Sequence, residues 1–252
     1  MIHQFAAAWN FLTIIPFPFA GKETVSAEDL GRSLTAFPWV GLALGLMAGA
    51  AYLGLSQALP QALVALSVIF LLTIATRGLH MDGLADTLDG LQGRTREISL
   101  KIMKESTIGT FGALGLIFAL GFKVSALFSL PPREAIKALW MMPLLGRWVF
   151  VTLLVYFPYA RPEGGLGSAF VSHAKPSNWI WATLFTGVAA ILIASWWGAV
   201  LAGITLSLTW MAGRYFKSRL GGVTGDTVGG TGEVVETVTL ILWNVYERFF
   251  NN

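Results

Sequence analysis

Long apolar segments separated by shorter polar ones make up most of this chain. Residues 39–59 carry no charged side chain, and four further segments are nearly as apolar: 61–79, 108–130, 138–157 and 234–250. About 20 apolar residues are enough for a helix to cross the roughly 30 Å hydrocarbon core of a bilayer. The uncharged stretch 176–213 would extend about 57 Å as one helix, so we expect two spans that meet near Trp196, Trp197 and Gly198. The pattern therefore predicts about seven transmembrane helices.

The remaining segments are shorter or more polar. Residues 1–20 are apolar but contain Pro16 and Pro18, so we expect a helix lying along the membrane surface, anchored by Trp9 and the phenylalanines. The polar segments are expected to form a loop and short helix (21–37), an amphipathic piece (97–105), a loop (158–177) and a glycine-rich loop (214–233).

Composition supports a membrane protein. Of the 252 residues, 55% are hydrophobic and only 12% are charged, whereas soluble domains carry about 25% charged residues. The expected fold is an all-α polytopic helical bundle of about seven transmembrane helices plus an N-terminal interfacial helix, in one domain over residues 1–252. The absence of cysteine excludes disulfide bonds and thiolate chemistry. The net charge of +3 is small, and we expect no nucleic-acid partner.

Three features within the spans carry further information. Gly41, Gly45 and Gly49 repeat every four residues, which is typical of a face on which membrane helices pack closely. Lys123 lies in the far half of its span, from which it could snorkel to the interface. Arg147 is costly inside a span, so it is either functional or paired with a structural carboxylate.

The distribution of basic residues predicts an orientation. With the N-terminus in the cytoplasm, the opposite side receives only Arg133, Lys137, Arg248 and at most Lys123. The cytoplasmic segments then contain Lys22, Arg32, Arg77, Arg94, Arg96, Lys101, Lys104, Arg161, Lys175, Arg214, Lys217 and Arg219. This bias follows the positive-inside rule.

Three aspartates between two apolar segments form the first candidate site. Asp82, Asp86 and Asp89 are spaced i, i+4 and i+7, so a helix places them on one face. Their mutual repulsion would become coordination around a hard cation such as Mg²⁺, which prefers oxygen ligands. Gly83 and Gly90 would let a backbone or a phosphate approach closely. The alternative is a solvated helix face at the membrane surface.

A second acidic cluster falls on the same side of the membrane. Asp226 lies in a glycine-rich stretch, and Glu233 and Glu236 follow at a spacing that shares one helix face. Acids in the first turn of a helix also favour its dipole, which would explain the two glutamates without a ligand. That alternative leaves unexplained the five glycines Gly221, Gly222, Gly225, Gly229 and Gly230. The two clusters together suggest one composite site of six carboxylates.

Basic residues near these acids indicate a phosphate-bearing substrate. Phosphoryl transfer relies mainly on positioning and on charge neutralisation by metals and basic side chains. The candidate phosphate partners are Lys101, Lys104, Arg94 and Arg147. Gly109 and Thr110 could add backbone or hydroxyl donors. His80 is either a base or ligand, or a structural histidine at a helix end.

The sequence at these positions resembles the cobalamin (5′-phosphate) synthase family, the adenosylcobinamide-GDP ribazoletransferases. The matching pieces cover nearly the whole chain: FLTIIP (11–16), GLHMDGLADTLDG (78–90), MKESTIGTFG (103–112), GRW (146–148) and GGVTGDTVGG (221–230), the last followed by Glu233 and Glu236. The core of the second piece is also similar to a motif of the CDP-alcohol phosphotransferases, which use clustered aspartates and Mg²⁺ at a cytoplasmic membrane face.

The resemblance implies a reaction and a set of roles. α-Ribazole or its 5′-phosphate would attack the cobinamide-linked phosphate of adenosylcobinamide-GDP, and GMP would leave. Asp82, Asp86 and Asp226 would hold Mg²⁺, with Glu233 and Glu236 completing the site. Asp89 would be the base, by analogy with the CDP-alcohol enzymes. The leaving GMP would lie against Lys101, Lys104 or Arg147.

The resemblance also implies a location. The protein would lie in the lipid bilayer of a bacterial or archaeal cytoplasmic (inner) membrane, with its active site facing the cytoplasm, and a homo-oligomer remains open. Two alternatives are a cation transporter that uses the clustered carboxylates and a non-catalytic membrane scaffold. Against a transporter, the acids lie at helix ends, whereas transporter sites lie toward the bilayer midplane.

Overall fold

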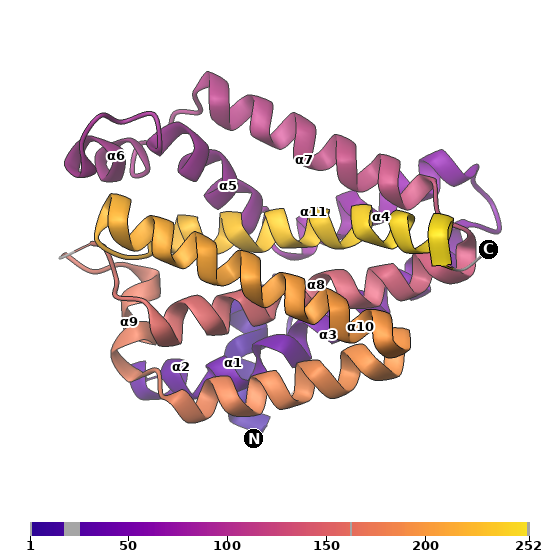
Figure 1. The fold of residues 1–252 in the computed structure, drawn as a ribbon, viewed down its shortest axis with the longest axis horizontal. Coiled ribbons are helices and arrows are strands. Elements are labelled where there is room, and N and C mark those ends of the chain that lie inside the picture. Colours follow the sequence, from indigo (N-terminus) through magenta and orange to yellow (C-terminus); the bar gives the residue numbers. More distant parts are fainter. Residues whose placement is uncertain (1, 18–25, 162, 251–252) are drawn as a thin grey trace.

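A computed structural model describes residues 2–17, 26–161 and 163–250, which contain helices and connections but no β-strand (Figure 1). In chain order the elements are α1 (Ile2–Leu12), α2 (Ala27–Ser33), the 3₁₀ turn η1 (Leu34–Ala36), α3 (Phe37–Leu55), α4 (Gln61–Ala75), α5 (Leu79–Gly90), α6 (Arg96–Ile102), α7 (Thr110–Phe128), α8 (Pro132–Tyr156), α9 (Leu166–His173), α10 (Pro176–Leu220) and α11 (Gly225–Phe250). The expectation of an all-α protein is confirmed for these residues.

Length and apolarity of the helices indicate fewer membrane spans than the sequence pattern predicted. Among the described residues, four helical segments are long and apolar enough to cross a bilayer: Glu28–Leu55, α7, α8 and α10. The pair α4 and α5, bent by 87° at the break between them, would add a fifth. The predicted count of seven is therefore not confirmed by these criteria.

The long helix α10 is two helices in one. Its backbone leaves helical geometry at Ala194 and Ser195, and the two halves fold back on each other there (Figure 1). A Cβ on Gly198 would lie only 2.0 Å from the carbonyl oxygen of Ala190, so only glycine permits the close return. The predicted break near residues 196–198 is thus confirmed to within a few residues.

Helix α8 is the centre of the bundle, and 18 of its 25 residues are buried. The glycines of α3 lie directly against it. A Cβ on Gly41 would come within 2.3 Å of the Pro143 carbonyl oxygen, and one on Gly45 within 2.7 Å of the Leu139 carbonyl oxygen. The small-residue face predicted from the sequence is therefore the face on which α3 packs against α8.

Several predicted loops and anchors are wrong in detail. The segment 214–233 is mostly helical, because α10 continues to Leu220 and α11 begins at Gly225. Thr224 and Thr227 start α11 by accepting each other's backbone N–H with their hydroxyls, at 3.2 and 2.8 Å. The predicted loop 158–177 contains α9.

The N-terminal helix also differs from its expectation. Trp9 is buried, and its indole N–H donates to the Ile15 carbonyl at 2.7 Å, so it packs within the protein instead of anchoring it in the bilayer. Pro18 and Lys22, which entered the sequence argument, lie outside the described residues.

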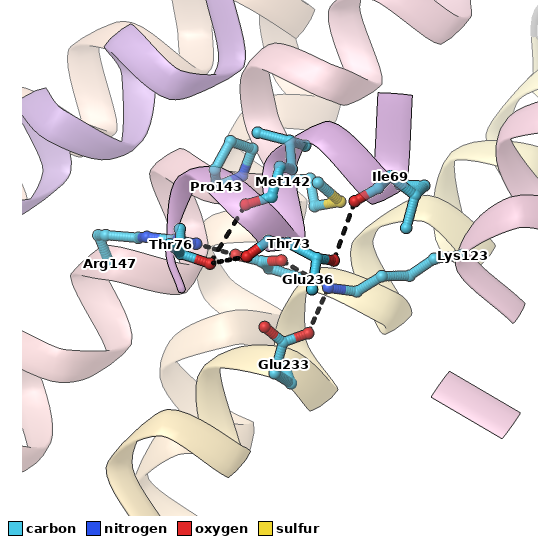
Figure 2. A pocket seen from close by; sticks show the side chains of 10 residues that line it. Ile69, Thr73, Thr76, Lys123, Met142, Pro143, Arg147, Glu233 and Glu236 are labelled. Carbon is cyan, nitrogen blue, oxygen red and sulfur yellow. Dashed lines mark hydrogen bonds and ion pairs between the residues drawn. The ribbon is translucent and has the colours of Figure 1, made fainter. Parts of the chain in front are cut away.

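Four charged side chains form a buried ion-pair network between α7, α8 and α11 (Figure 2). Lys123 reaches Glu233 at 2.5 Å and Glu236 at 2.6 Å, and Arg147 pairs with the other oxygen of Glu236. All four side chains are at most 6% exposed. Lys123 therefore does not snorkel to the interface as predicted. Arg147 has the carboxylate partner that was its structural alternative.

The network balances its own charge, since two cations face two anions. Taking one such ion out of water costs several kcal/mol, which a close partner must offset. The cavity beside the network is only about 20 Å³, room for about one water. Neutralisation therefore comes from the side chains themselves. These ion pairs connect α7, α8 and α11 to one another.

Lys123→Met tests this network, because it leaves two buried carboxylates with a single cation. We expect it to lower stability by about 3–5 kcal/mol, seen as a fall in Tm of roughly 10 °C in detergent. The double variant Lys123→Met/Glu233→Gln should recover part of the loss.

Lys104→Met is the matched control, because the Lys104–Glu163 pair is about half exposed and such pairs contribute about 0–1 kcal/mol. A Lys123→Met protein as stable as the parent would show that the network does not hold the bundle together.

Candidate functional site

The aspartate helix α5 is bent by 87° from the direction of α4 at a sharp turn. Arg77 and Gly78 both have positive φ, +58° and +65°, which turns the chain before Leu79. After this bend α5 carries Asp82, Asp86 and Asp89 on one face, as the spacing predicted. The three acids therefore lie beyond the bend, on α5 and not on α4.

Glycines bring α5 against the start of α11. A Cβ on Gly83 would come within 2.8 Å of the Asp226 carbonyl oxygen, and one on Gly230 within 3.1 Å of the Leu84 Cα. Gly229 lies similarly close to His80. These glycines admit a neighbouring helix, not a phosphate, which explains two of the five glycines that the sequence left unassigned, Gly229 and Gly230. Gly225 differs, since a Cβ there would meet nothing within 4 Å.

This crossing puts the acids of α5 near Asp226, with electrostatic consequences. The pKa of Asp86 is raised to about 7, first because burial penalises the charged carboxylate and then because Asp82 and Asp226 repel it. Burial also raises the pKa of Asp226, although the nearby guanidinium of Arg161 opposes this. The cluster therefore has more negative charge than its protein neighbours neutralise.

Arg161 is the cation that the sequence argument did not assign to the site. Its guanidinium donates to Asp226 at 2.5 Å, and the Thr224 hydroxyl donates to the same carboxylate oxygen at 3.3 Å. The Nε of Arg161 is buried without a hydrogen-bond partner. The only sequence signal was its place in a polar segment on the same predicted side of the membrane, and that segment joins Val223 at an isolated bridge through Tyr159.

Asp89 occupies a different position from the other two aspartates of α5. One of its carboxylate oxygens accepts the Gly109 N–H at 2.6 Å, and the other accepts the Gly112 N–H at 2.8 Å. These N–H groups begin α7, where helices present donors without intrahelical partners. Asp89 therefore caps α7 and fixes it to α5, and Gly109 serves that cap.

The two glutamates of α11 lie apart from Asp226. At about 1.5 Å per residue, Glu233 and Glu236 lie roughly 10 and 15 Å further along the helix. Both are held by Lys123, and Glu236 also by Arg147. The six carboxylates are therefore two groups, one at the helix ends and one in the bundle core.

The remaining predicted phosphate partners lie at the surface near α6. Arg94, Lys101 and Lys104 are exposed, and Lys104 pairs with Glu163. Arg147 is buried away from them, next to Glu236 and His80. Lys101 and Lys104 thus stay candidates for contact with a substrate, whereas Arg147 acts inside the bundle.

In the described part of the chain, no three His, Asp or Glu side chains converge as ligands of one metal ion. Mg²⁺ does not require such a group, because it usually keeps several waters and binds one or two carboxylates plus substrate phosphates. Among the described residues, Asp82 and Asp86 form no ion pair, and Asp226 pairs only with Arg161. They are therefore the residues that could hold a divalent ion together with a phosphate.

A cavity of about 170 Å³ opens beside these carboxylates. Asp82, Asp226, Arg161 and His80 line part of it. Its other walls are mainly apolar and aromatic, and include Phe11, Phe37, Phe150, Leu154 and Phe170. The sequence argument did not find this cavity, because its walls come from segments distant in the chain.

Comparison with known proteins places the chain among relatives of similar length. It is 38% identical to the adenosylcobinamide-GDP ribazoletransferase of Desulforamulus reducens over 96% of both chains. It is 39% identical to that of Geotalea daltonii, again over 96% of both chains. It is 40% identical to that of Klebsiella pneumoniae strain 342 over 96% of this chain and 99% of the relative.

No solved structure gives a significant match. The sequence profile of cobalamin-5-phosphate synthase matches residues 4–244, which include both acidic helices, Arg161 and every wall of the cavity. Together with the identity over nearly full length, this match shows that the chain belongs to the cobalamin-5-phosphate synthase family.

Proposed function

We propose that this protein joins adenosylcobinamide-GDP to α-ribazole or its 5′-phosphate, which yields adenosylcobalamin or its 5′-phosphate and GMP. The observation that carries the proposal is the crossing of α5 and α11, which sets Asp82 and Asp86 near Asp226 at the mouth of a cavity. The relatives are named for this transfer. That shared name also argues against the cation-transporter and scaffold alternatives.

The donor set fits Mg²⁺, because it consists of neighbouring carboxylates, and the pKa of Asp86 among them is raised to about 7 by its burial and then by repulsion from Asp82 and Asp226. Asp82, Asp86 and Asp226 would hold the ion with water and substrate phosphate oxygens. When bound, the ion neutralises negative charge on the phosphates as it develops.

The side chains of the protein then position the two substrates. A ribose hydroxyl forms the new bond to phosphorus while the bond to the GMP oxygen breaks, and the hydroxyl proton leaves to a base. Arg161 holds Asp226 and lines the cavity, so it orients that carboxylate toward the phosphate. In this proposal the exposed Lys101 and Lys104 receive the GMP phosphate.

The role of Asp89 changes in this proposal. The sequence argument made it the base, but both of its oxygens already accept N–H groups from the start of α7. We therefore give it a positioning role, in which it fixes α7 relative to Asp82 and Asp86. The Glu233–Glu236 pair likewise stabilises the bundle and is not part of the ion site.

Replacing the acids one at a time tests these roles. Asp82→Asn and Asp226→Asn should each lower product formation by roughly 100-fold or more, because an ion ligand is lost, and Asp82→Asn should do so at unchanged Tm. Asp89→Asn should lower the Tm as well as the rate, because the amide cannot accept both N–H groups. The assay is chromatography of product and GMP from purified protein in lipid, with Mg²⁺ or with EDTA.

Glu28→Gln is the control, since Glu28 lies in an exposed pair with Arg32 on α2. Full activity of Asp82→Asn, or an undiminished rate in EDTA, would contradict the ion site. An Asp89→Asn protein with parental Tm and a rate as low as that of Asp82→Asn would restore Asp89 as a base.

The glycine contact between α5 and α11 offers a second test. Gly83→Ala puts a Cβ within 2.8 Å of the Asp226 carbonyl oxygen, so the two helix ends must move apart. Because a displacement of about 1 Å can cost about 100-fold in rate, we expect activity to fall by that order while the protein remains folded. Gly121→Ala, where a Cβ meets nothing within 4 Å, should keep the parental rate; equal rates for both would show that the spacing is not critical.

Orientation can be measured with cysteine labelling, because the natural chain contains no cysteine. With the site facing the cytoplasm, Ser106→Cys should react with an impermeant maleimide only in inside-out vesicles. Ser129→Cys, in the connection between α7 and α8, should react only from the opposite side. Both positions are exposed, so labelling of the two from the same side would refute the proposed topology.

A further inference from the structure

The cavity beside the carboxylates has an aromatic wall assembled before any ligand binds. The wall consists of Phe11 from α1, Phe37 from α3, Phe150 from α8 and Phe170 from α9. The ring centroids of Phe11 and Phe170 are 4.7 Å apart, and those of Phe37 and Phe170 are 5.5 Å apart, both edge to face. These contacts hold the rings in place, yet about 170 Å³ remains beside them.

The size of the cavity limits what can enter it. Sites for drug-sized ligands measure about 300–1,000 Å³, so this cavity accepts one fragment of a large substrate. The aromatic end suits a flat ring system, since aromatic groups stack or meet edge to face at little entropic cost. The charged end, with Asp82, Asp226 and Arg161, suits the sugar and phosphate that such a ring would carry.

His80 adds one directed polar group to this wall. Its ring lies 4.7 Å from that of Phe150, and its Nδ1 faces the Arg147 guanidinium at 3.4 Å. Because a guanidinium only donates, Nδ1 is the acceptor and the ring proton is on Nε2. Because Glu236 holds Arg147 in place, the buried ion-pair network fixes the tautomer of His80. The N–H at Nε2 is then available to a ligand in the cavity, which His80 lines.

We propose that this cavity is the specificity pocket for the base of the attacking nucleoside, and that it selects a flat bicyclic base with few polar edge groups. This assignment rests on the proposed function and identifies which part of which substrate lies there. Phe11, Phe37, Phe150 and Phe170 surround the ring, and His80 donates from Nε2 to a single acceptor nitrogen of the base. The ribose then points toward Asp82 and Asp226, where its hydroxyl reaches the phosphate.

The composition of the wall distinguishes this occupant from the guanine of the second substrate. Guanine carries a carbonyl, an amino group and ring N–H groups, and burying such groups without partners costs about 1–3 kcal/mol each. The phenylalanines, Leu79, Leu154 and Val228 of the lining offer only carbon surface, and its polar side chains are His80, Tyr159, Asp82, Arg161 and Asp226. A base with one acceptor nitrogen loses little there, whereas guanine would leave several groups unsatisfied.

Binding of free bases in the absence of metal tests the pocket separately from the reaction. Equilibrium dialysis would use the protein in lipid nanodiscs with EDTA, and benzimidazole, adenine and guanine as probes. Benzimidazole should bind measurably and compete with α-ribazole, while adenine and guanine bind at least about tenfold more weakly. Adenosylcobinamide-GDP should not displace benzimidazole.

Two variants with matched size changes locate the binding. Gly225→Leu extends into the open space at the cavity edge, so it should weaken benzimidazole binding by roughly tenfold or more. Gly203→Leu adds the same side chain in open space on α10 and should leave binding unchanged. His80→Ala should weaken the binding of benzimidazole and leave the weaker binding of adenine and guanine unchanged.

The outcomes separate the pocket from the proposed reaction. Benzimidazole binding that Gly225→Leu weakens, in a protein that forms no product, would keep the pocket and reject the transferase. Equal binding of benzimidazole, adenine and guanine would overturn the pocket. Benzimidazole binding that is equal in the two leucine variants would overturn it as well. Displacement of benzimidazole by guanine or by adenosylcobinamide-GDP would assign the cavity to the other substrate, and displacement only by phospholipid would assign it to a lipid chain.

Discussion

Neutralisation of charge is the constraint on which this structure depends. A membrane protein can bury a carboxylate only if a cation accompanies it, because no water is present to solvate it. Lys123 and Arg147 meet this requirement for Glu233 and Glu236 inside the bundle. Asp82 and Asp86 form no such ion pair among the described residues, and the pKa of Asp86 is raised to about 7 by its burial and then by the charges of Asp82 and Asp226. The contrast separates the acids that are neutralised inside the bundle from the acids that we propose bind the ion.

The position of those acids depends on glycines, which let the backbones of α5 and α11 touch with no side chain between them. Gly83, Gly229 and Gly230 let α5 and the start of α11 approach closely enough for their acids to repel one another. Larger residues would separate the helices, which would relieve the repulsion and disperse the site. The glycines therefore maintain an arrangement that electrostatics alone would disfavour, and a divalent ion with a bound phosphate would remove that cost.

The sequence predicted the features that depend on local spacing. The common face of Asp82, Asp86 and Asp89, the glycine face of α3 and the break in α10 all follow from periodicity or length. The features it missed depend on contacts between distant segments. Lys123 and Glu233 are 110 residues apart, and Arg161 and Asp226 are 65 apart, so no local pattern could pair them. The neighbours of Asp89 were missed for the same reason. Its spacing matches that of the other aspartates, whereas its oxygens accept N–H groups at the start of α7.

Arg147 connects the buried network to the site, which suggests why the chemistry takes place in a membrane protein. Its guanidinium pairs with Glu236 on α11 and faces His80 on α5, and His80 lines the cavity. A shift of α8 or α11 would therefore disturb both the buried charges and the orientation of His80. Because the charges are far more costly to separate in an apolar core than in water, the bundle resists such a shift. The transmembrane core thus acts as the rigid support of a site at its end, and the aromatic wall, contributed by α1, α3, α8 and α9, keeps its shape for the same reason.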